Sequence, residues 1–208
     1  MYGKLSYLRW LLPNAPYNME AATTAWYMPK ALPNAMKPRV PGDLDEVSED
    51  DDEAGIMKSV AALDAVVRGE IDRGVPPHRI VVGGFSQGCA ISLVWGLCGK
   101  ERNNVAGVVP LSGYFPLADR ISALRKAAGY SAEPEKDKET KKWFIAHGLK
   151  DALVPVALFK HQAEELGKWV NEREVVEGHV YENMAHNTVN AELRDMLIWL
   201  EKIIPADG

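Results

Sequence analysis

The sequence predicts an α/β fold, with a mainly parallel β-sheet covered by helices on both faces. Strand patterns and helix patterns alternate along the chain, which is typical of parallel strands joined by helical crossovers. The strand candidates are continuous apolar runs, as expected for strands that are buried on both faces. The 208 residues are 47% hydrophobic and 25% charged, so we expect a single domain over residues 1–208 with one sizeable core.

The first quarter of the chain is expected to hold one strand and then a long loop. The run LSYLRWLL at residues 5–12 has strand character and ends before a proline. Residues 13–50 are rich in proline and in small or polar residues, which favours a loop, with a hydrophobic contact around Trp26 and Tyr27. The acidic run EVSEDDDE at residues 46–53 lacks the ligand and glycine pattern of a calcium loop. We interpret it as a solvated segment that complements the positive end of the following helix.

The rest of the chain alternates regularly between helix and strand patterns. Apolar residues recur at helical spacing in the helix candidates, and glycine, proline or charged residues separate the elements. A charged surface loop is expected over residues 131–142. The predicted helices span residues 56–71, 86–99, 119–128, 156–170 and 188–203. The predicted strands span residues 79–84, 105–113, 143–148 and 174–183.

The bulk properties exclude several classes of protein. A net charge of −5 argues against a nucleic-acid partner, and no apolar run approaches the eighteen residues of a membrane span. The N-terminal segment lacks the features of a secretory signal. Cys89 and Cys98, nine residues apart on one predicted helix, are interpreted as reduced thiols. These features together predict a cytoplasmic protein.

A serine between two glycines follows the most apolar predicted strand. In RIVVGGFSQGCA, residues 79–90, Ser86 stands at the carboxyl end of the strand, where functional groups gather in parallel sheets. A nucleophile there requires a sharp, strained turn from strand to helix, and side chains two residues away on either side would collide. Gly84 and Gly88 are expected to remove both collisions, which gives the G-x-S-x-G pattern of a nucleophile elbow. The helix after Ser86 would also direct unpaired N–H groups toward the reaction centre.

Two other interpretations of this stretch compete with the elbow. A G-x-S-x-G pattern also occurs by chance in unrelated proteins. The spacing from Gly83 to Gly88 matches a phosphate-binding loop, but Cys89 and Ala90 stand where lysine and serine or threonine are needed to hold phosphate and magnesium. The residues therefore argue against nucleotide binding.

The chain after the serine supplies a candidate base and a candidate acid. A hydroxyl is a poor nucleophile without a base and a group that orients the base, and elbow folds place them in the order serine, acid, histidine. Asp151 follows the strand at residues 143–148, and His186 follows the strand at residues 174–183. Both residues are expected at the same edge of the sheet as Ser86.

The other histidines fit the role of base less well. His147 ends a strand but precedes Asp151, so we interpret it as a hydrogen-bonding support for the Asp151 loop. Three others are set aside because of their positions before a strand, within a helix and within a strand: His78, His161 and His179.

Three motifs together resemble the acyl-protein thioesterase family, also called the lysophospholipase/carboxylesterase family of small α/β-hydrolases. They are GGFSQGCA, HGLKDALVP and YENMAHNT, accompanied by PNAP near the start and GVPPHRI before the elbow strand. The resemblance extends from about Leu5 to the C-terminus, and three motifs at positions consistent with the fold are highly specific. It implies an α/β-hydrolase fold.

The resemblance also implies roles for individual residues. Ser86 would be the nucleophile, His186 the general base and Asp151 its orienting partner, with the backbone N–H of Gln87 as an oxyanion donor. Trp26, in AWYMP, falls where the family has a tryptophan that borders the acyl-binding side. Such enzymes hydrolyse thioesters of S-palmitoylated proteins, lysophospholipids and short esters, and they use neither a metal nor an organic cofactor. A plain carboxylesterase of the same fold that prefers short soluble esters is one alternative.

The sequence departs from the family pattern in two places. The family has further N-terminal strands, one ending in an H-G-x-G-D loop that supplies a second oxyanion donor, and this motif is absent here. The resemblance therefore implies an N-terminally truncated domain that lacks a central strand, and the alternative to an active hydrolase is a truncated, catalytically impaired chain that at most binds acyl groups or a partner. One oxyanion donor is worth ~10²–10³ in turnover. Four or five buried apolar side chains at roughly 1.5–3 kcal/mol each match or exceed the net stability of a whole domain, which is about 5–15 kcal/mol. Cys89, where relatives often carry glycine, is interpreted as a packing thiol.

Overall fold

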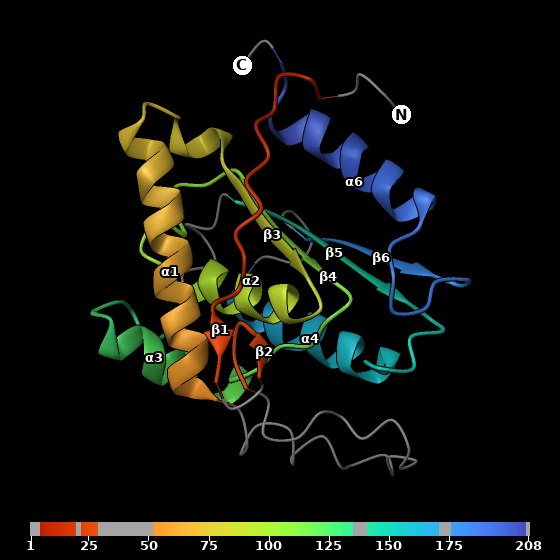
Figure 1. The fold of residues 1–208 in the computed structure, drawn as a ribbon, viewed down its shortest axis with the longest axis horizontal. Coiled ribbons are helices and arrows are strands. Elements are labelled where there is room, and N and C mark those ends of the chain that lie inside the picture. The colour runs from red at the N-terminus through yellow and green to blue at the C-terminus, as the bar shows by residue number, and fades with distance from the viewer. Residues whose placement is uncertain (1–4, 20–21, 29–51, 135–140, 171–175, 207–208) are drawn as a thin grey trace.

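A four-stranded parallel sheet forms the centre of the molecule (Figure 1). The computed structural model describes residues 5–19, 22–28, 52–134, 141–170 and 176–206. Each strand is parallel to its neighbour, and the order in the sheet follows the order in the chain. The strands are β3 (Val81–Phe85), β4 (Gly107–Leu111), β5 (Lys142–Gly148) and β6 (Val176–Tyr181).

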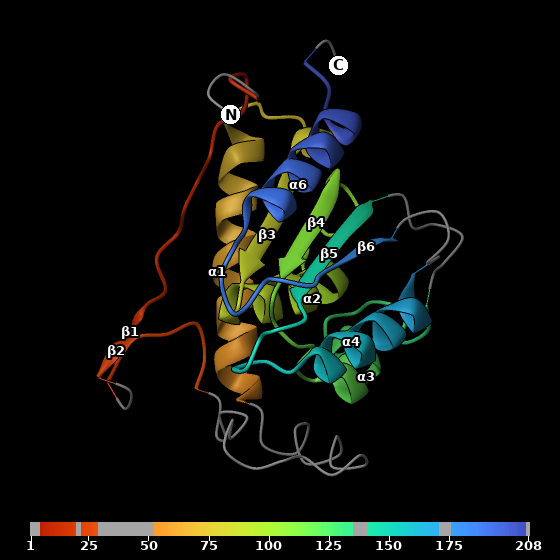
Figure 2. The same ribbon diagram turned by 90° about the vertical axis from the view of Figure 1, so that its right-hand side faces the viewer.

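Helices cover both faces of this sheet, as predicted (Figures 1 and 2). One face packs against α6, and the opposite face packs against α2 and the helices around it. Each predicted helix and each strand from β3 onward is present, with ends that differ by a few residues. The helices are α1 (Glu53–Asp72), α2 (Gln87–Cys98), α3 (Ile121–Ala127), α4 (Val156–Trp169) and α6 (Asn190–Ile203), with 3₁₀ turns at Pro77–Arg79 and Ala118–Arg120.

Side chains of the central strands alternate between two hydrophobic cores. Val108, Trp143 and Ile145 belong to the core beside α2, whereas Val109 and Phe144 belong to the core beside α6. This alternation is the two-residue period of a strand. Both faces are apolar, which explains why the strands read as continuous apolar runs in the sequence.

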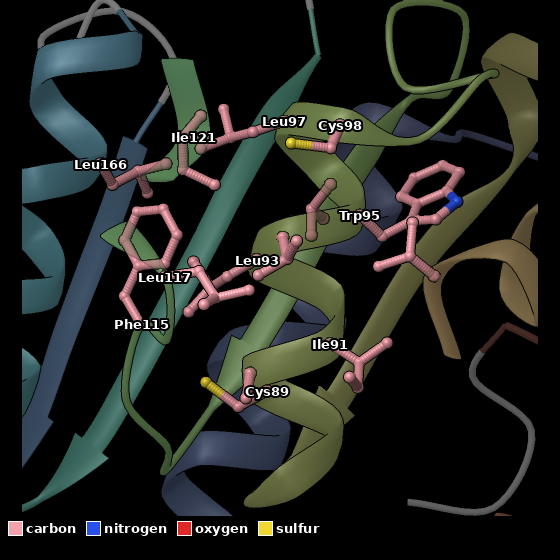
Figure 3. Close-up of a cluster of buried hydrophobic side chains, with 14 of the residues drawn as sticks. Cys89, Ile91, Leu93, Trp95, Leu97, Cys98, Phe115, Leu117, Ile121 and Leu166 are labelled. Carbon is pink, nitrogen blue, oxygen red and sulfur yellow. The ribbon is translucent and has the colours of Figure 1, made fainter. Parts of the chain in front are cut away.

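Helix α2 is buried on all sides and fixes the position of the residues at its start. Its residues from Cys89 to Cys98 are all buried, and Figure 3 shows Leu93 and Leu97 pointing into the same apolar cluster as Leu117 and Ile121. A Cβ on Gly96 would lie 2.4 Å from the Trp143 ring, so the helix packs closely against β5. Each large apolar side chain buried here is worth roughly 1.5–3 kcal/mol.

The prediction of a strand at residues 5–12 is wrong. Residues 5–7 form a turn, and residues 8–16 have no regular structure. A strand requires a neighbour that exchanges backbone hydrogen bonds, and this segment is held by side chains instead. Leu5 is buried in the core beside α6, and the Tyr7 hydroxyl donates to the Ile204 carbonyl at 3.0 Å. The Leu12 side chain is 85% exposed.

A two-stranded antiparallel hairpin follows, formed by β1 (Tyr17–Asn18) and β2 (Thr23–Thr24). It lies within the stretch for which a loop was predicted. Most of the predicted loop at residues 13–50 and most of the acidic run at residues 46–53 lie outside the described residues. The last part of the acidic run agrees with its interpretation, because Asp52 caps α1 by accepting the Gly55 N–H.

Within the described ranges, no helix combines the length and the apolar character needed to cross a membrane. Cys89 and Cys98 are both buried and do not pair with each other. Burial raises the pKa of both thiols, that of Cys98 to about 11. Both cysteines therefore stay as uncharged thiols in the core, as the sequence suggested.

Glu192, in the first turn of α6, is a buried carboxyl group whose charge destabilises the fold. Its side chain is fully buried, and neither carboxyl oxygen has a well-formed hydrogen bond among the described residues. Burial raises its pKa from about 4.5 to about 7, and the nearby Val189 N–H only partly offsets that effect. Folding favours the protonated carboxyl. The contribution of this group to the stability of the fold is therefore fully present below pH 4.5 and is lost as the pH rises through 7.

We therefore expect Glu192→Gln to raise the free energy of unfolding by about 3 kcal/mol at pH 8. At pH 4.5 the variant and the unaltered chain should differ little, because glutamine then replaces an uncharged carboxyl. Urea denaturation at the two pH values measures both differences. An equal effect of the substitution at the two pH values would contradict a raised pKa of Glu192 in the folded chain.

Candidate active site

Ser86 occupies a single-residue bend between β3 and α2. It is the one residue between Phe85, which ends the strand, and Gln87, which begins the helix, and its backbone has φ 56° and ψ −115°. A positive φ is strained for a residue with a side chain and persists only where the surroundings impose it. The end of β4 does so here, because the Ser86 N–H donates to the Leu111 carbonyl at 3.0 Å. The predicted elbow is therefore present.

The two glycines around Ser86 have different importance. A Cβ on Gly84 would lie 2.3 Å from the carbonyl carbon of Gly88, closer than real Cβ contacts come. A Cβ on Gly88 would meet nothing within 4 Å. The expectation that both glycines relieve a collision is thus correct for Gly84 and wrong for Gly88. A side chain at position 84 would collide with the main chain at position 88, and that main chain is there whichever residue occupies position 88. Glycine is therefore required at position 84 and not at position 88.

His186 lies between Ser86 and Asp151, in the loop that joins β6 to α6. Its Nε2 is 2.9 Å from the Ser86 Oγ, and its Nδ1 is 2.7 Å from the Asp151 Oδ2. An ionised carboxylate can only accept, so Nδ1 carries the proton and Nε2 is free to accept from the serine hydroxyl. The ring packs against Phe85 at 4.9 Å between centroids. The three residues that the sequence singled out are therefore brought together.

Asp151 is held in place by the loop in which it stands. Its side chain is fully buried, and its Oδ1 accepts the N–H groups of Leu153 at 3.0 Å and Val154 at 2.8 Å. This leaves Oδ2 for His186. The loop also lies directly against the His186 loop, because a Cβ on Gly148 would come within 2.1 Å of the Met184 carbonyl oxygen.

His147 supports the Asp151 loop, in agreement with its interpretation from the sequence. It is fully buried, and its Nε2 lies 2.8 Å from the carbonyl oxygen of Val154. A carbonyl only accepts, so Nε2 carries the proton. Burial lowers the pKa of this imidazole, which keeps it neutral beside the Asp151 carboxylate, 3.7 Å away.

Gln87 connects the elbow to Trp26 in a way that no sequence motif indicated. As the first residue of α2, its backbone N–H belongs to the group that a helix leaves without an internal acceptor. Its side-chain Oε1 accepts the Trp26 N–H at 3.0 Å, and its Nε2 donates to the Tyr27 carbonyl at 3.3 Å. Trp26 is partly exposed and packs against the core beside α2. These contacts join residues about 60 positions apart, so neither residue type nor spacing could have predicted them.

Metal-ligating side chains do not gather in the part of the chain that the structure describes: it holds no group of three or more His, Cys, Asp or Glu residues placed to bind an ion. The arrangement of Ser86, His186 and Asp151 can instead perform nucleophilic chemistry with proton transfer through the imidazole.

A parallel sheet with helices on both faces and a serine on the bend after one strand defines an α/β-hydrolase. The chain belongs to the Phospholipase/Carboxylesterase family of hydrolases, whose family model matches residues 5–204. Acyl-protein thioesterase 1 of Emericella nidulans is 34% identical over an alignment of 214 positions, which covers 99% of this chain and 81% of that protein. Acyl-protein thioesterase 1 of Mycosarcoma maydis is 35% identical, and the alignment covers 97% of this chain and 80% of that protein.

Solved structures share the fold. Arabidopsis thaliana SOBER1 aligns with a TM-score of 0.69 over 94% of this chain and 83% of that chain, at 22% identity. Acyl-protein thioesterase 2 of Zea mays aligns with a TM-score of 0.64 over 92% of this chain and 80% of that chain, at 23% identity. The fold predicted from the sequence is thus confirmed.

Proposed function

We propose that this chain is a serine hydrolase that removes acyl groups from S-acylated proteins, with lysophospholipids and short esters as further substrates. The hydrogen-bonded chain from Ser86 through His186 to Asp151, at 2.9 and 2.7 Å, carries the proposal of a catalytic triad. The similarity to acyl-protein thioesterase 1 of two fungi supports the choice of substrate. The two unpaired thiols support a cytoplasmic location.

The geometry suggests a two-stage reaction. His186 accepts the proton of the Ser86 hydroxyl through Nε2 as the oxygen attacks the acyl carbonyl, and Asp151 stabilises the resulting imidazolium. The negative oxygen of the tetrahedral intermediate accepts the Gln87 N–H at the start of α2. As the bond from the acyl carbon to the leaving sulfur or oxygen breaks, His186 gives its Nε2 proton to that atom; the thiol or alcohol departs and an acyl-serine remains. Water, activated by the same imidazole, releases the fatty acid and restores Ser86.

The substrate class is tested with two substrates that carry the same octanoyl chain, an S-octanoyl cysteine peptide and a p-nitrophenyl ester. We expect hydrolysis of both, with a higher kcat/KM for the peptide, and a loss of at least about 10³-fold for both in Ser86→Ala. Turnover of the ester without turnover of the peptide would contradict the acyl-protein substrate and favour a plain carboxylesterase.

The alternative is a catalytically impaired chain that binds acyl groups but turns them over slowly. The 208 residues contain no H-G-x-G-D motif, and a hydrolase that works with one oxyanion donor in place of two loses ~10²–10³ in turnover. Rapid acylation of Ser86 by an activated ester, followed by release of fatty acid too slow for multiple turnover, would support this alternative.

A further inference from the structure

The side-chain amide of Gln87 forms hydrogen bonds with the main chain of residues 26 and 27, as the backbone of a neighbouring strand would. It accepts one N–H and donates to one carbonyl, those of the consecutive residues Trp26 and Tyr27. An amide group is suited to this role because it contains both a donor and an acceptor. Residues 26–28, the Trp26 strip, belong to no helix or strand, so side chains determine where the strip lies.

The other end of the Trp26 strip is held from α1. The Ser59 hydroxyl donates to the Trp26 carbonyl, and the Met28 N–H donates to Asp52 at 3.0 Å. Tyr27 is 2% exposed, and its hydroxyl donates to that of Tyr114 at 3.0 Å. With Tyr27 anchored in the interior, the partly exposed indole of Trp26 is held at the surface of the core.

Among these anchors, Gln87 adjoins the nucleophile directly. Its N–H is the proposed oxyanion donor, and its side chain reaches across to Trp26. Gln87 therefore links the main chain of Trp26 to the residue beside Ser86 and has two tasks, one performed by its backbone and the other by its side chain. A substitution of the side chain changes the second task and leaves the N–H in place.

We propose that the Gln87 side chain is a positioning residue that holds Trp26 against the elbow and thereby sets the preference for long over short acyl chains. This inference rests on the proposed hydrolase function and adds a determinant of selectivity to it. Long acyl chains extend beyond the reaction centre and need an apolar surface at a fixed distance from it. An acetyl group is too short to use that surface.

Gln87→Met is the test variant, because methionine has nearly the length and the helix propensity of glutamine but forms neither hydrogen bond. We expect the ratio of kcat/KM for p-nitrophenyl octanoate to that for p-nitrophenyl acetate to fall about tenfold, mainly through a higher KM for octanoate. In a Trp26→Ala background, the same substitution should change the ratio less than twofold. A ratio within twofold of the unaltered chain, or an equal fall in both backgrounds, would overturn the proposal.

Amide hydrogen exchange by NMR provides a readout that does not depend on activity. In Gln87→Met, exchange of the Trp26 N–H should accelerate at least tenfold, while that of the Gly55 N–H, bound to Asp52, should be unchanged. Unchanged Trp26 exchange would overturn the anchoring role. A complete lack of ester hydrolysis by the unaltered chain would instead overturn the proposed function and the selectivity role together, and exchange would still decide the anchoring role.

Discussion

Replacing Gly84 with alanine is expected to lower the free energy of unfolding by about 3 kcal/mol or more and to reduce ester hydrolysis at least 10²-fold. The added Cβ would come within 2.3 to 2.6 Å of three main-chain atoms of Gly88. Backbone at the start of a buried helix cannot move aside as a flexible side chain can, so β3 and α2 must separate. A shift of about 1 Å in a reacting group is enough to cost ~10²-fold in rate. Urea denaturation and kcat/KM for p-nitrophenyl butyrate measure the two effects.

Gly88→Ala is the matched control for this prediction. The same methyl group is added four residues away, where it meets nothing within 4 Å. Alanine also favours a helix over glycine by about 1 kcal/mol, so the variant should be as stable as the unaltered chain or slightly more stable. If both alanine variants lose stability equally, the strand and the helix do not meet at Gly84 as described.

Replacing Asp151 with asparagine is expected to reduce kcat about 10⁴-fold while the chain stays folded. The amide oxygen can still accept the N–H groups of Leu153 and Val154, which bind Oδ1 in the unaltered chain. The amide nitrogen would then face His186 and donate to Nδ1, so the imidazole proton would move to Nε2. With a proton there, His186 cannot accept the proton of Ser86. Steady-state kinetics with a short p-nitrophenyl ester measure the loss.

Asp195→Asn is a suitable control, because Asp195 lies on α6 outside the site and accepts the Tyr181 hydroxyl at 3.0 Å. An amide oxygen can accept the same bond, so we expect kcat within about twofold of the unaltered chain. A loss for Asp151→Asn no larger than that of the control would contradict the orienting role of Asp151.

The fold from β3 onward could be predicted because its strands are short apolar runs between clear turn signals. Val108 and Val109 face opposite cores, so apolar residues continue without alternation and the strand type can be inferred. The segment at residues 5–12 has a similar composition but forms no strand. An apolar composition indicates that the side chains of a segment prefer burial. Strand formation also requires a neighbouring strand to form backbone hydrogen bonds with, and the local sequence does not reveal one.

The candidate triad was predictable for a different reason. Parallel strands end at one edge of a sheet, so residues that directly follow different strands, such as Ser86, Asp151 and His186, converge there. The supporting contacts depend on side-chain geometry. The hydrogen bonds of Gln87 to residues 26–27 and the open space beside Gly88 become visible only when the elements are packed.

The nucleophilic role of Ser86 is tested most directly by peptide-level mass spectrometry after treatment with a fluorophosphonate. We expect one phosphonyl group per chain, located on the peptide that carries Ser86, with no labelling of Ser86→Ala and at least 10³-fold slower labelling of His186→Ala. A phosphonyl group on a different residue, or labelling of Ser86→Ala at an unchanged rate, would contradict the account of this protein as a hydrolase that acts through Ser86.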